Sequence, residues 1–324
     1  MKIVIVGCGR MGQGIAITFA LAGHPIELID TKKRTKKELA LVLKNTNKSI
    51  ENNLKLISHI NLIKKSYIKK ILKNISILHH SNSNKPIKSA NIIFECVPEK
   101  LKIKKDILKL ISNITSKKVI ISSTTSSILS TDLAKHTQFP ERFLNAHWLN
   151  PPYLMPLIEI SPCKKTSINN LKKIKKLFLD IGKVPVICKP SPGYIVPRIQ
   201  ALAMNEAAKI SEEKTATSED IDKATIYGFG LRFATLGLLE FIDWGGIDTL
   251  NNASDYMAKA MKNKKFSSPR IIKKHIKNNN LGLSTQSGFL DWKNIDIEKY
   301  QQEKLKKFVK IIKLLNIQPK INIS

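Results

Sequence analysis

The chain has 324 residues, a length that favours two domains, and its hydrophobic fraction of 42% is typical of a globular protein. No stretch approaches the ~18 consecutive apolar residues of a membrane-spanning helix, so we expect a soluble protein without a membrane partner. A net charge of +30 would suit a nucleic-acid-binding protein, but only six of the 55 basic residues are arginine, and the lysines are spread along the whole chain. Because specific readers of nucleic acid rely on arginine forks and interleaved aromatic residues, nucleic acid is the least favoured partner.

The cysteines and the N-terminus indicate a reducing compartment. The N-terminal apolar run is only four residues long before the first glycine, which does not fit a signal peptide. The cysteines have neither the spacing of a metal site nor the density of a disulfide scaffold; they are Cys8, Cys96, Cys163 and Cys188. We therefore expect a cytoplasmic protein with free thiols and no bound metal.

The first residues have the pattern of a dinucleotide-binding strand, turn and helix. Residues 3–6 form a wholly apolar run, typical of a parallel strand that is buried on both faces, and residues 14–22 have a helical pattern. In the turn between them, Gly7 permits a tight bend, Gly9 lets the backbone approach a pyrophosphate, and Gly12 allows close packing of helix and strand. The predicted cofactor-binding residues of this turn are Gly7, Gly9, Arg10, Met11 and Gly12.

Asp30 ends the second predicted strand, residues 26–29. A carboxylate at this point accepts hydrogen bonds from the adenosine ribose hydroxyls and repels a 2′-phosphate, which predicts NAD rather than NADP as the cofactor. Three cationic residues, Lys32, Lys33 and Arg34, follow at once and can weaken this preference. The strictness of the choice therefore stays open.

The next hundred residues complete an open sheet. Residues 36–73 are helical in pattern and rich in lysine, so we expect a helical arm over about residues 36–75. Further strands are predicted over residues 90–97 and 118–122, and the second leads into a Ser/Thr-rich loop, residues 123–127. Loops at the carboxyl ends of parallel strands bind ligands, and hydroxyl groups there can hold a substrate oxygen, although such runs also cap helices.

Two extended runs, residues 143–148 and 157–160, place an imidazole opposite a carboxylate. Prolines at positions 151, 152 and 156 exclude a continuous helix between them. One run carries His147 and the other carries Glu159. If the runs lie side by side, Glu159 can accept a hydrogen bond from one nitrogen of His147 and leave the other nitrogen free to exchange a proton.

The pattern changes near residue 190, where we place the domain boundary. A helix over residues 168–182 and a strand over residues 185–188 precede a break at residues 189–193. Beyond it, the pattern is helical over residues 194–213, 218–227, 236–264 and 269–278. The prediction is a Rossmann-type α/β domain over residues 1–190, followed by an all-helical domain over residues 191–318.

Over nearly its whole length the sequence resembles the 3-hydroxyacyl-CoA dehydrogenases. Four motifs match that family in order: the glycine turn with Asp30, the segment Glu-Cys-Val-Pro-Glu-Lys-Leu-Lys-Ile-Lys at 95–104, the Ser-Thr-Thr-Ser-Ser loop, and the His-Trp-Leu-Asn-Pro segment at 147–151. The resemblance implies that His147 is the catalytic histidine, with Glu159 as its supporting glutamate. It also implies that Ser126 and Asn150 are the substrate serine and the active-site asparagine, and that the helical domain pairs two subunits into a homodimer.

The resemblance further implies that Glu99 and Lys104 line the nicotinamide end of the cofactor site. Two positions depart from the family pattern. Pro197 stands where acyl-CoA enzymes have an asparagine that contacts the substrate, and Arg232 stands where they carry an uncharged sequence. Arg232 is more similar to the arginine of the hydroxy-acid branch, which includes L-gulonate 3-dehydrogenase (lambda-crystallin) and carnitine dehydrogenase. A guanidinium there can bind a substrate carboxylate or form a surface or interface ion pair.

These observations predict an NAD-dependent oxidoreductase of fatty acid metabolism that converts a short-chain 3-hydroxyacyl-CoA, such as 3-hydroxybutyryl-CoA, into the 3-oxoacyl-CoA. The alternative is a dehydrogenase of a small free 3-hydroxy acid, which Pro197 and Arg232 favour. Acyl-chain length, physiological direction and pathway are not fixed by the sequence.

Overall fold

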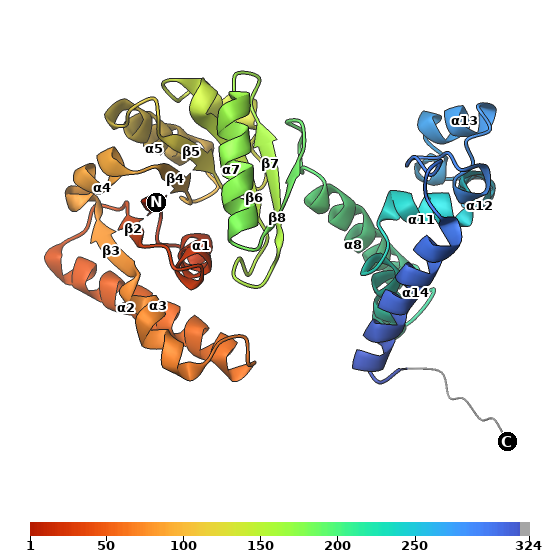
Figure 1. The fold of residues 1–324 in the computed structure, drawn as a ribbon, viewed down its shortest axis with the longest axis horizontal. Coiled ribbons are helices and arrows are strands. Elements are labelled where there is room, and N and C mark those ends of the chain that lie inside the picture. Colours follow the sequence, from red (N-terminus) through yellow and green to blue (C-terminus); the bar gives the residue numbers. More distant parts are fainter. Residues whose placement is uncertain (318–324) are drawn as a thin grey trace. The chain divides into compact units, whose positions relative to one another are not determined.

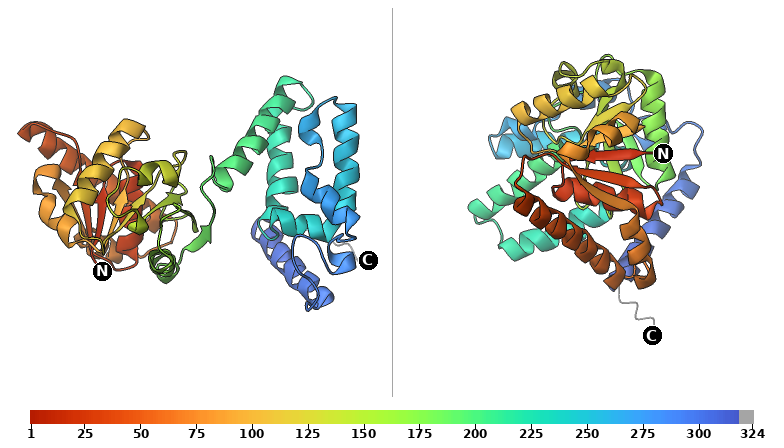
Figure 2. Two further views of the ribbon diagram at one scale, coloured as in Figure 1. Left: turned by 90° about the horizontal axis from the view of Figure 1, so that it is seen from above. Right: turned by 90° about the vertical axis from the view of Figure 1, so that its left-hand side faces the viewer.

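The computed structural model describes residues 1–317 and divides the chain into two compact units, Met1–Met204 and the residues from Asn205 onward. The first unit combines a sheet with helices, and the second is built from helices and short turns (Figures 1 and 2). The change from a mixed to a helical composition agrees with the predicted fold class. The division falls within the helix α8, Val196–Glu212, beyond the break that the sequence pattern indicated.

The first unit contains an eight-stranded sheet in the order β3-β2-β1-β4-β5-β6-β7-β8. All neighbours pair in parallel except β6 and β7, which pair in antiparallel fashion. From β1 the chain continues to β2 and β3 on one side of the sheet and then returns to β4 on the other side of β1. The boundary between β1 and β4 is therefore the switch point at which open α/β sheets bind ligands. The strands are β1 Ile3–Val6, β2 Ile26–Asp30, β3 Ile75–His79, β4 Ile92–Glu95, β5 Ile120–Ser123, β6 Phe143–Trp148, β7 Leu157–Pro162 and β8 Val184–Ile187.

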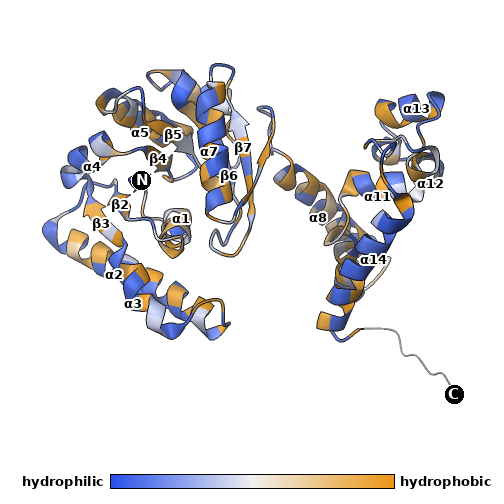
Figure 3. Ribbon diagram, viewed as in Figure 1, coloured by the Kyte–Doolittle hydropathy of each residue, from blue (hydrophilic) through white to orange (hydrophobic). Residues whose placement is uncertain are grey.

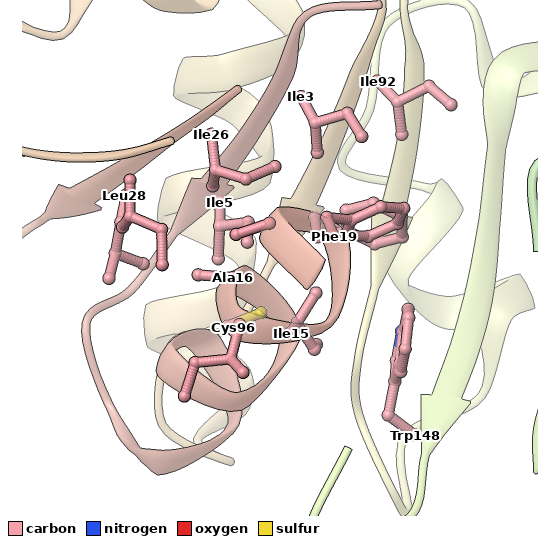
Figure 4. Packing of buried hydrophobic residues seen from close by; sticks show 14 of the residues in the cluster. Ile3, Ile5, Ile15, Ala16, Phe19, Ile26, Leu28, Ile92, Cys96 and Trp148 are labelled. Carbon is pink, nitrogen blue, oxygen red and sulfur yellow. The ribbon is translucent and has the colours of Figure 1, made fainter. Parts of the chain in front are cut away.

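The sheet is buried on both faces because successive side chains of its central strands enter different clusters. In β1, Ile3 and Ile5 belong to one buried cluster, and Val4 and Val6 belong to the other. Around the first cluster, the ring of Phe19 on α1, Arg10–Leu21, packs 5.8 Å from the ring of Trp148 (Figure 4). The continuous apolar pattern of the strands is therefore explained by helices on both sides of the sheet.

The helices of this unit alternate polar and apolar residues along their length (Figure 3). Helix α1 begins at Arg10, four residues before the start that the sequence pattern predicted, because the backbone turns into the helix directly after the N-cap Gly9. The other helices are α2 Lys36–His59, α3 Ile68–Lys73, α4 Asn84–Ser89, α5 Leu101–Ile114, α6 Ser130–Ala134 and α7 Ile168–Asp180, with single turns η1 Lys65–Tyr67, η2 His80–Asn82 and η3 Pro140–Arg142.

The lysine-rich segment predicted as one long arm consists of two α-helices. Helix α2 is capped by a box between Thr35 and Glu38, and its buried residues Ile50, Leu54 and Ile57 belong to the core cluster next to α1. The chain leaves the helix where Asn61 adopts a positive φ of 60°. One face of the segment is thus part of the domain core, and its lysines lie on the remaining surface.

The second unit departs from the predicted helix pattern in three main respects, of which one is an additional helix, α14. The helix expected over residues 236–264 is interrupted at Gly246, which has a φ of +95° that favours glycine. The helix expected to end at residue 227 continues through a π-helical turn, η4 Ala224–Gly230, into α10. The helices are α9 Ser218–Lys223, α10 Leu231–Phe233, α11 Leu238–Gly245, α12 Ile247–Ala260, α13 Arg270–Lys277 and the unpredicted α14 Ile297–Leu314, with single turns η5 Lys264–Phe266 and η6 Leu283–Thr285.

Asp243 holds the last loops of this unit against α11. Its buried carboxylate accepts hydrogen bonds from the backbone N–H groups of Phe289 and Leu290, at 2.9 and 2.8 Å, and from Nε1 of Trp292 at 2.9 Å. Among residues 1–317, no single helix is long and apolar enough to cross a membrane; only the pair Ser218–Phe233 and Leu238–Gly245, bent by 87°, meets that test together.

The glycine turn gives a prediction on stability. A Cβ atom at Gly12 would lie 1.9 Å from the carbonyl oxygen of Gly7, whereas a Cβ atom at Gly9 meets nothing within 4 Å. We expect Gly12→Ala to lower the free energy of unfolding by about 1–3 kcal/mol, because the backbone must move apart, and to lower the melting temperature by several degrees. Gly9→Ala is the matched control, and its melting temperature, measured by circular dichroism, should equal that of the wild type. Equal melting of both variants would show that the turn does not depend on this contact.

Candidate active site

The carboxyl ends of five strands surround a cavity of about 720 Å³ in the first unit. Most of the residues that line it follow β1, β2, β4 and β5 or lie at the end of β6, as expected for an open parallel sheet. Of the predicted site residues, the cavity is lined by Gly7, Gly9, Arg10, Met11, Asp30, Glu99, Lys104, Ser126, His147 and Asn150. Gly12 packs behind the turn, and Glu159 lies behind His147.

The strand order separates the predicted ribose-binding carboxylate from the predicted catalytic histidine along this cavity. Asp30 stands at the end of β2 and His147 on β6, with β1, β4 and β5 between them. Four strand spacings amount to roughly 19 Å, a span that suits an extended dinucleotide with one end at each group. The glycine turn and the N-terminus of α1, whose first N–H groups have no acceptor within the helix, lie between the two ends.

Open space over Gly9 supports the fit of a dinucleotide. Nothing lies within 4 Å of the position that a side chain would take there, so a pyrophosphate can approach the backbone. The N-cap of α1 has no side-chain hydrogen bond, which leaves the helix N-terminus available to an anion. The residues of the turn therefore fit the predicted cofactor.

His147 and Glu159 form a buried hydrogen-bonded pair. They stand directly opposite each other in the antiparallel register of β6 and β7, and Nδ1 of His147 lies 2.7 Å from Oε2 of Glu159. The second carboxylate oxygen accepts the backbone N–H groups of Ile195 and Val196, both at 2.8 Å. Within residues 1–317, Nε2 of His147 has no hydrogen-bond partner, and the ring lines the cavity. This is the arrangement that the two extended runs predicted.

The surroundings of Glu159 favour its charged form. Burial acts to raise the pKa of this carboxyl, but the hydrogen bonds from His147, Val196 and Ile195 outweigh it and hold the pKa below the usual value. A carboxylate with both oxygens occupied cannot rotate away, so it fixes the orientation of the imidazole.

Lys104 is not free to contact a ligand. Its buried Nζ donates to both oxygens of Glu95, at 2.9 and 3.2 Å, and to the carbonyl oxygen of Val97 at 3.2 Å. It also lies 3.4 Å from Glu99. Glu95, which we did not single out from the sequence, is fully buried and accepts a further bond from Ser123 at 2.5 Å. Lys104 therefore lines the cavity with its ammonium group held in an ion-pair network with Glu95 and Glu99.

Glu99 holds the loop that carries Ser126. Its Oε1 accepts hydrogen bonds from the hydroxyl of Thr125, the backbone N–H groups of Ser126 and Ser127, both at 3.1 Å, and the hydroxyl of Ser127 at 2.8 Å. Burial acts to raise the pKa of Glu99, but these hydrogen bonds and the nearby Lys104 keep it below the usual value. The loop is thus fixed while the Ser126 hydroxyl, which has no partner within residues 1–317, stays available to a ligand.

Two residues of α8 line the same cavity, namely Pro197 and Gln200. Pro197 contributes no hydrogen-bond donor, as expected. Gln200, one turn further on, was not predicted, because a glutamine in a helical pattern carries no distinctive signal. Arg232 belongs to the second unit, where its guanidinium lies 5.6 Å from the ring centre of Phe241 and forms no ion pair within residues 1–317.

Asp30 is already paired in this structure. Nε of Arg34 donates to one carboxylate oxygen, and Nη2 lies 3.3 Å from the other. The side chain of Asp30 is 6% exposed and that of Arg34 is 20% exposed, and both line the cavity. A ribose that binds here must share Asp30 with this guanidinium.

Fold and site define a class: an oxidoreductase that binds a dinucleotide along a Rossmann sheet and presents an imidazole at its far end. The family model described as 3-hydroxyacyl-CoA dehydrogenase, NAD binding domain, matches residues 2–191, and the C-terminal domain model of the same family matches residues 193–292. The chain belongs to the 3-hydroxyacyl-CoA dehydrogenase family. It is an NAD-dependent enzyme that acts on CH–OH groups.

Three known proteins illustrate the relationship. A 3-hydroxybutyryl-CoA dehydrogenase of Clostridioides difficile is 31% identical over 298 residues, which cover 90% of this chain and 99% of that protein. A 5-formyl-3-hydroxy-2-methylpyridine 4-carboxylate 5-dehydrogenase of Mesorhizobium japonicum is 28% identical over 230 residues, 71% of this chain and 74% of that protein. The crystal structure of a 3-hydroxyacyl-CoA dehydrogenase from Archaeoglobus fulgidus has a TM-score of 0.77 at 26% identity, covering 98% of this chain and all of that one.

The pairing of Asp30 gives a prediction on the cofactor. Asp30→Ala should weaken NADH binding by about 10–100-fold and relax discrimination against NADPH, because a charged hydrogen-bond acceptor is lost from the ribose site. Arg34→Gln is the matched variant; it frees Asp30 and removes a cation, so it should increase the preference for NADH. Dissociation constants from fluorescence titration with both nucleotides provide the measurement. An unchanged NADH to NADPH ratio in Asp30→Ala would show that this carboxylate does not read the ribose.

The depressed pKa of Glu159 gives a prediction on pH dependence. A carboxyl group whose pKa is lower in the folded state than its usual value of 4.5 stabilises the fold above that pH, and the contribution is lost as the pH falls through the folded-state pKa. The free energy of unfolding should therefore be larger for the wild type than for Glu159→Gln at neutral pH, and the difference should shrink below about pH 4.5. Urea unfolding across this range measures it. A difference that stays constant with pH would mean that Glu159 gains nothing from its charge in the folded state.

Proposed function

We propose that the protein oxidises a short-chain L-3-hydroxyacyl-CoA, such as 3-hydroxybutyryl-CoA, to the corresponding 3-oxoacyl-CoA, and that the reaction is reversible. The observation that carries this proposal is the buried His147–Glu159 pair, with its free nitrogen at the same cavity as the glycine turn and Asp30. The similarity to the 3-hydroxybutyryl-CoA dehydrogenase of Clostridioides difficile supports the substrate class.

In the proposed mechanism His147 acts as the general base. NAD, when bound, would accept the hydride that leaves C3 of the substrate, and the protein supplies the group that accepts the hydroxyl proton. Nε2 of His147 takes the proton of the C3 hydroxyl as the carbon loses its hydride, and the imidazole then carries a positive charge. Glu159 stabilises that charge through its 2.7 Å hydrogen bond to Nδ1. In the reverse direction the protonated imidazole returns the proton to the oxygen on C3.

Ser126 and Asn150 would orient the reacting oxygen and the substrate. Both line the cavity, and their side chains make no hydrogen bond within residues 1–317, so their polar groups can bind a ligand. The Glu99 network fixes the backbone of the Ser126 loop before substrate arrives, which reduces the ordering that binding must achieve.

A dehydrogenase of a small free 3-hydroxy acid is the second candidate. Pro197 offers no side-chain hydrogen bond to a thioester, and Arg232 carries a guanidinium without an ion-pair partner in the part of the chain that the structure describes. The similarity to an enzyme of Mesorhizobium japonicum that is named for a carboxylate substrate supports this candidate.

We also propose a cytoplasmic homodimer that pairs through the helical unit. The 18-residue helix α14 has apolar and polar faces but no buried residue in the single chain, which supports an additional packing partner. A role in fatty acid metabolism would follow from the proposed acyl-CoA substrate.

A substrate panel separates the two candidates. NADH formation, followed by absorbance, should be fastest with 3-hydroxybutyryl-CoA and slow with L-gulonate and carnitine. Faster turnover of either free acid would overturn the acyl-CoA proposal in favour of the second candidate. Arg232→Gln serves as an internal check, since it should reduce turnover strongly only if a substrate carboxylate is bound by this guanidinium.

The proposed role of His147 as the base predicts how a variant turns over the best substrate of that panel. His147→Gln should lower turnover by about 10²–10⁴-fold, because the glutamine amide cannot accept the hydroxyl proton as the imidazole does. NADH affinity should stay close to that of the wild type. Turnover equal to that of the wild type would place the base elsewhere.

A further inference from the structure

Tyr194 contacts the proposed base directly. It lies in the turn between β8 and α8, its side chain is buried, and its ring is stacked on that of His147. The ring centres are 5.1 Å apart and the planes differ by only 8°. An imidazole held at Nδ1 alone can still tilt about that hydrogen bond, and a parallel ring against its face removes this freedom.

The hydroxyl group of Tyr194 connects the stack to the loop of Ser126. It donates a hydrogen bond to the carbonyl oxygen of Thr125 at 2.9 Å and accepts one from Nδ2 of Asn145 at 3.0 Å. Thr125 precedes Ser126 in the chain, and Asn145 precedes His147 by two residues on β6. The same side chain therefore contacts the imidazole, the strand that carries it and the loop that carries the proposed substrate serine.

The backbone of this turn is bound to the other member of the pair. Gly193 and Tyr194 both have positive φ angles, 73° and 45°, and the next two N–H groups, those of Ile195 and Val196, point at Oε1 of Glu159. A non-glycine residue in the left-handed region is uncommon and persists where its surroundings fix it. Here the stack, the two hydroxyl hydrogen bonds and the two N–H groups fix it together.

We infer that Tyr194 is a positioning residue: its ring sets the plane of His147, and its hydroxyl group sets the loop of Ser126. This inference rests on the proposed role of His147 in proton transfer. Small displacements of a reacting group lower rates strongly, and an offset of about 1 Å can cost about 10²-fold. The ring and the hydroxyl group act on different parts of the site, so two substitutions separate them.

The test compares Tyr194→Phe with Tyr194→Leu on the best substrate of the panel. Tyr194→Phe keeps the stack but removes both hydrogen bonds, so we expect KM for the substrate to rise about 3–10-fold with kcat and its pH profile nearly unchanged. Tyr194→Leu also removes the stack, so we expect kcat to fall about 10–100-fold and the pH profile of kcat/KM to shift. NADH affinity should be the same in both variants.

Tyr153→Phe is the matched control for loss of a tyrosine hydroxyl. Tyr153 belongs to the same unit, its hydroxyl donates to Oδ1 of Asn53 at 2.9 Å, and neither residue lines the cavity. We expect it to leave KM and kcat unchanged. Melting temperatures of all three variants distinguish a loss of folding from a loss of positioning. If Tyr194→Leu does not fold, the KM effect of Tyr194→Phe alone decides the role of the hydroxyl.

A spectroscopic measurement keeps this inference separate from the proposed function. In protein labelled with ¹⁵N-histidine, the ring signals of His147 should move between wild type and Tyr194→Leu, and return toward the wild type in Tyr194→Phe, whether or not any substrate is turned over. Unchanged ring signals and an unchanged pH profile in Tyr194→Leu would overturn the inference. An inactive wild type with shifted ring signals would instead overturn the proposed function alone.

Discussion

The hydrogen bond between Glu159 and His147 is the interaction on which the site depends. It joins two neighbouring strands at directly opposed positions, so its geometry is set by the register of the sheet and not by a flexible loop. The carboxylate is also bound by the N–H groups that begin α8, which ties the imidazole to the end of the first unit. The antiparallel pair β6–β7 therefore holds the chemical centre of the site within the sheet itself.

The site is supported by carboxylates that no ligand needs to touch. Glu95 neutralises Lys104, Glu99 binds the loop of Ser126, and Glu159 holds His147. Each carboxylate accepts hydrogen bonds from several donors, as the buried Glu95 and Glu159 must because they are removed from water. Among the polar groups of the cavity, the Ser126 hydroxyl, the Asn150 amide and Nε2 of His147 have no hydrogen-bond partner within residues 1–317. Substrate can reach these groups without first displacing a protein contact.

The glycine turn and the His147–Glu159 pair could be predicted from the sequence because short-range rules govern them. A buried apolar run followed by closely spaced glycines specifies the turn. Prolines between two extended runs exclude a helix there, and two adjacent strands then place His147 opposite Glu159. The bond from Ser123 to the buried Glu95 and the stack of Tyr194 on His147 join elements far apart in the chain, and the pairing of Arg34 with Asp30, only four residues away, depends on side-chain orientation. In the second unit, periodicity indicated helices correctly but missed the break at Gly246, because a helical pattern does not reveal such a break. It also missed α14, because the many lysines of this helix obscure its apolar face.

A crystal structure of the enzyme with NAD and acetoacetyl-CoA tests the central claim most directly. If His147 is the base, Nε2 of His147 will lie within hydrogen-bonding distance of the oxygen on C3, Nδ1 will keep its bond to Glu159, and C3 will face the nicotinamide ring. A complex in which that oxygen meets a different proton donor, with the imidazole out of reach, would contradict it.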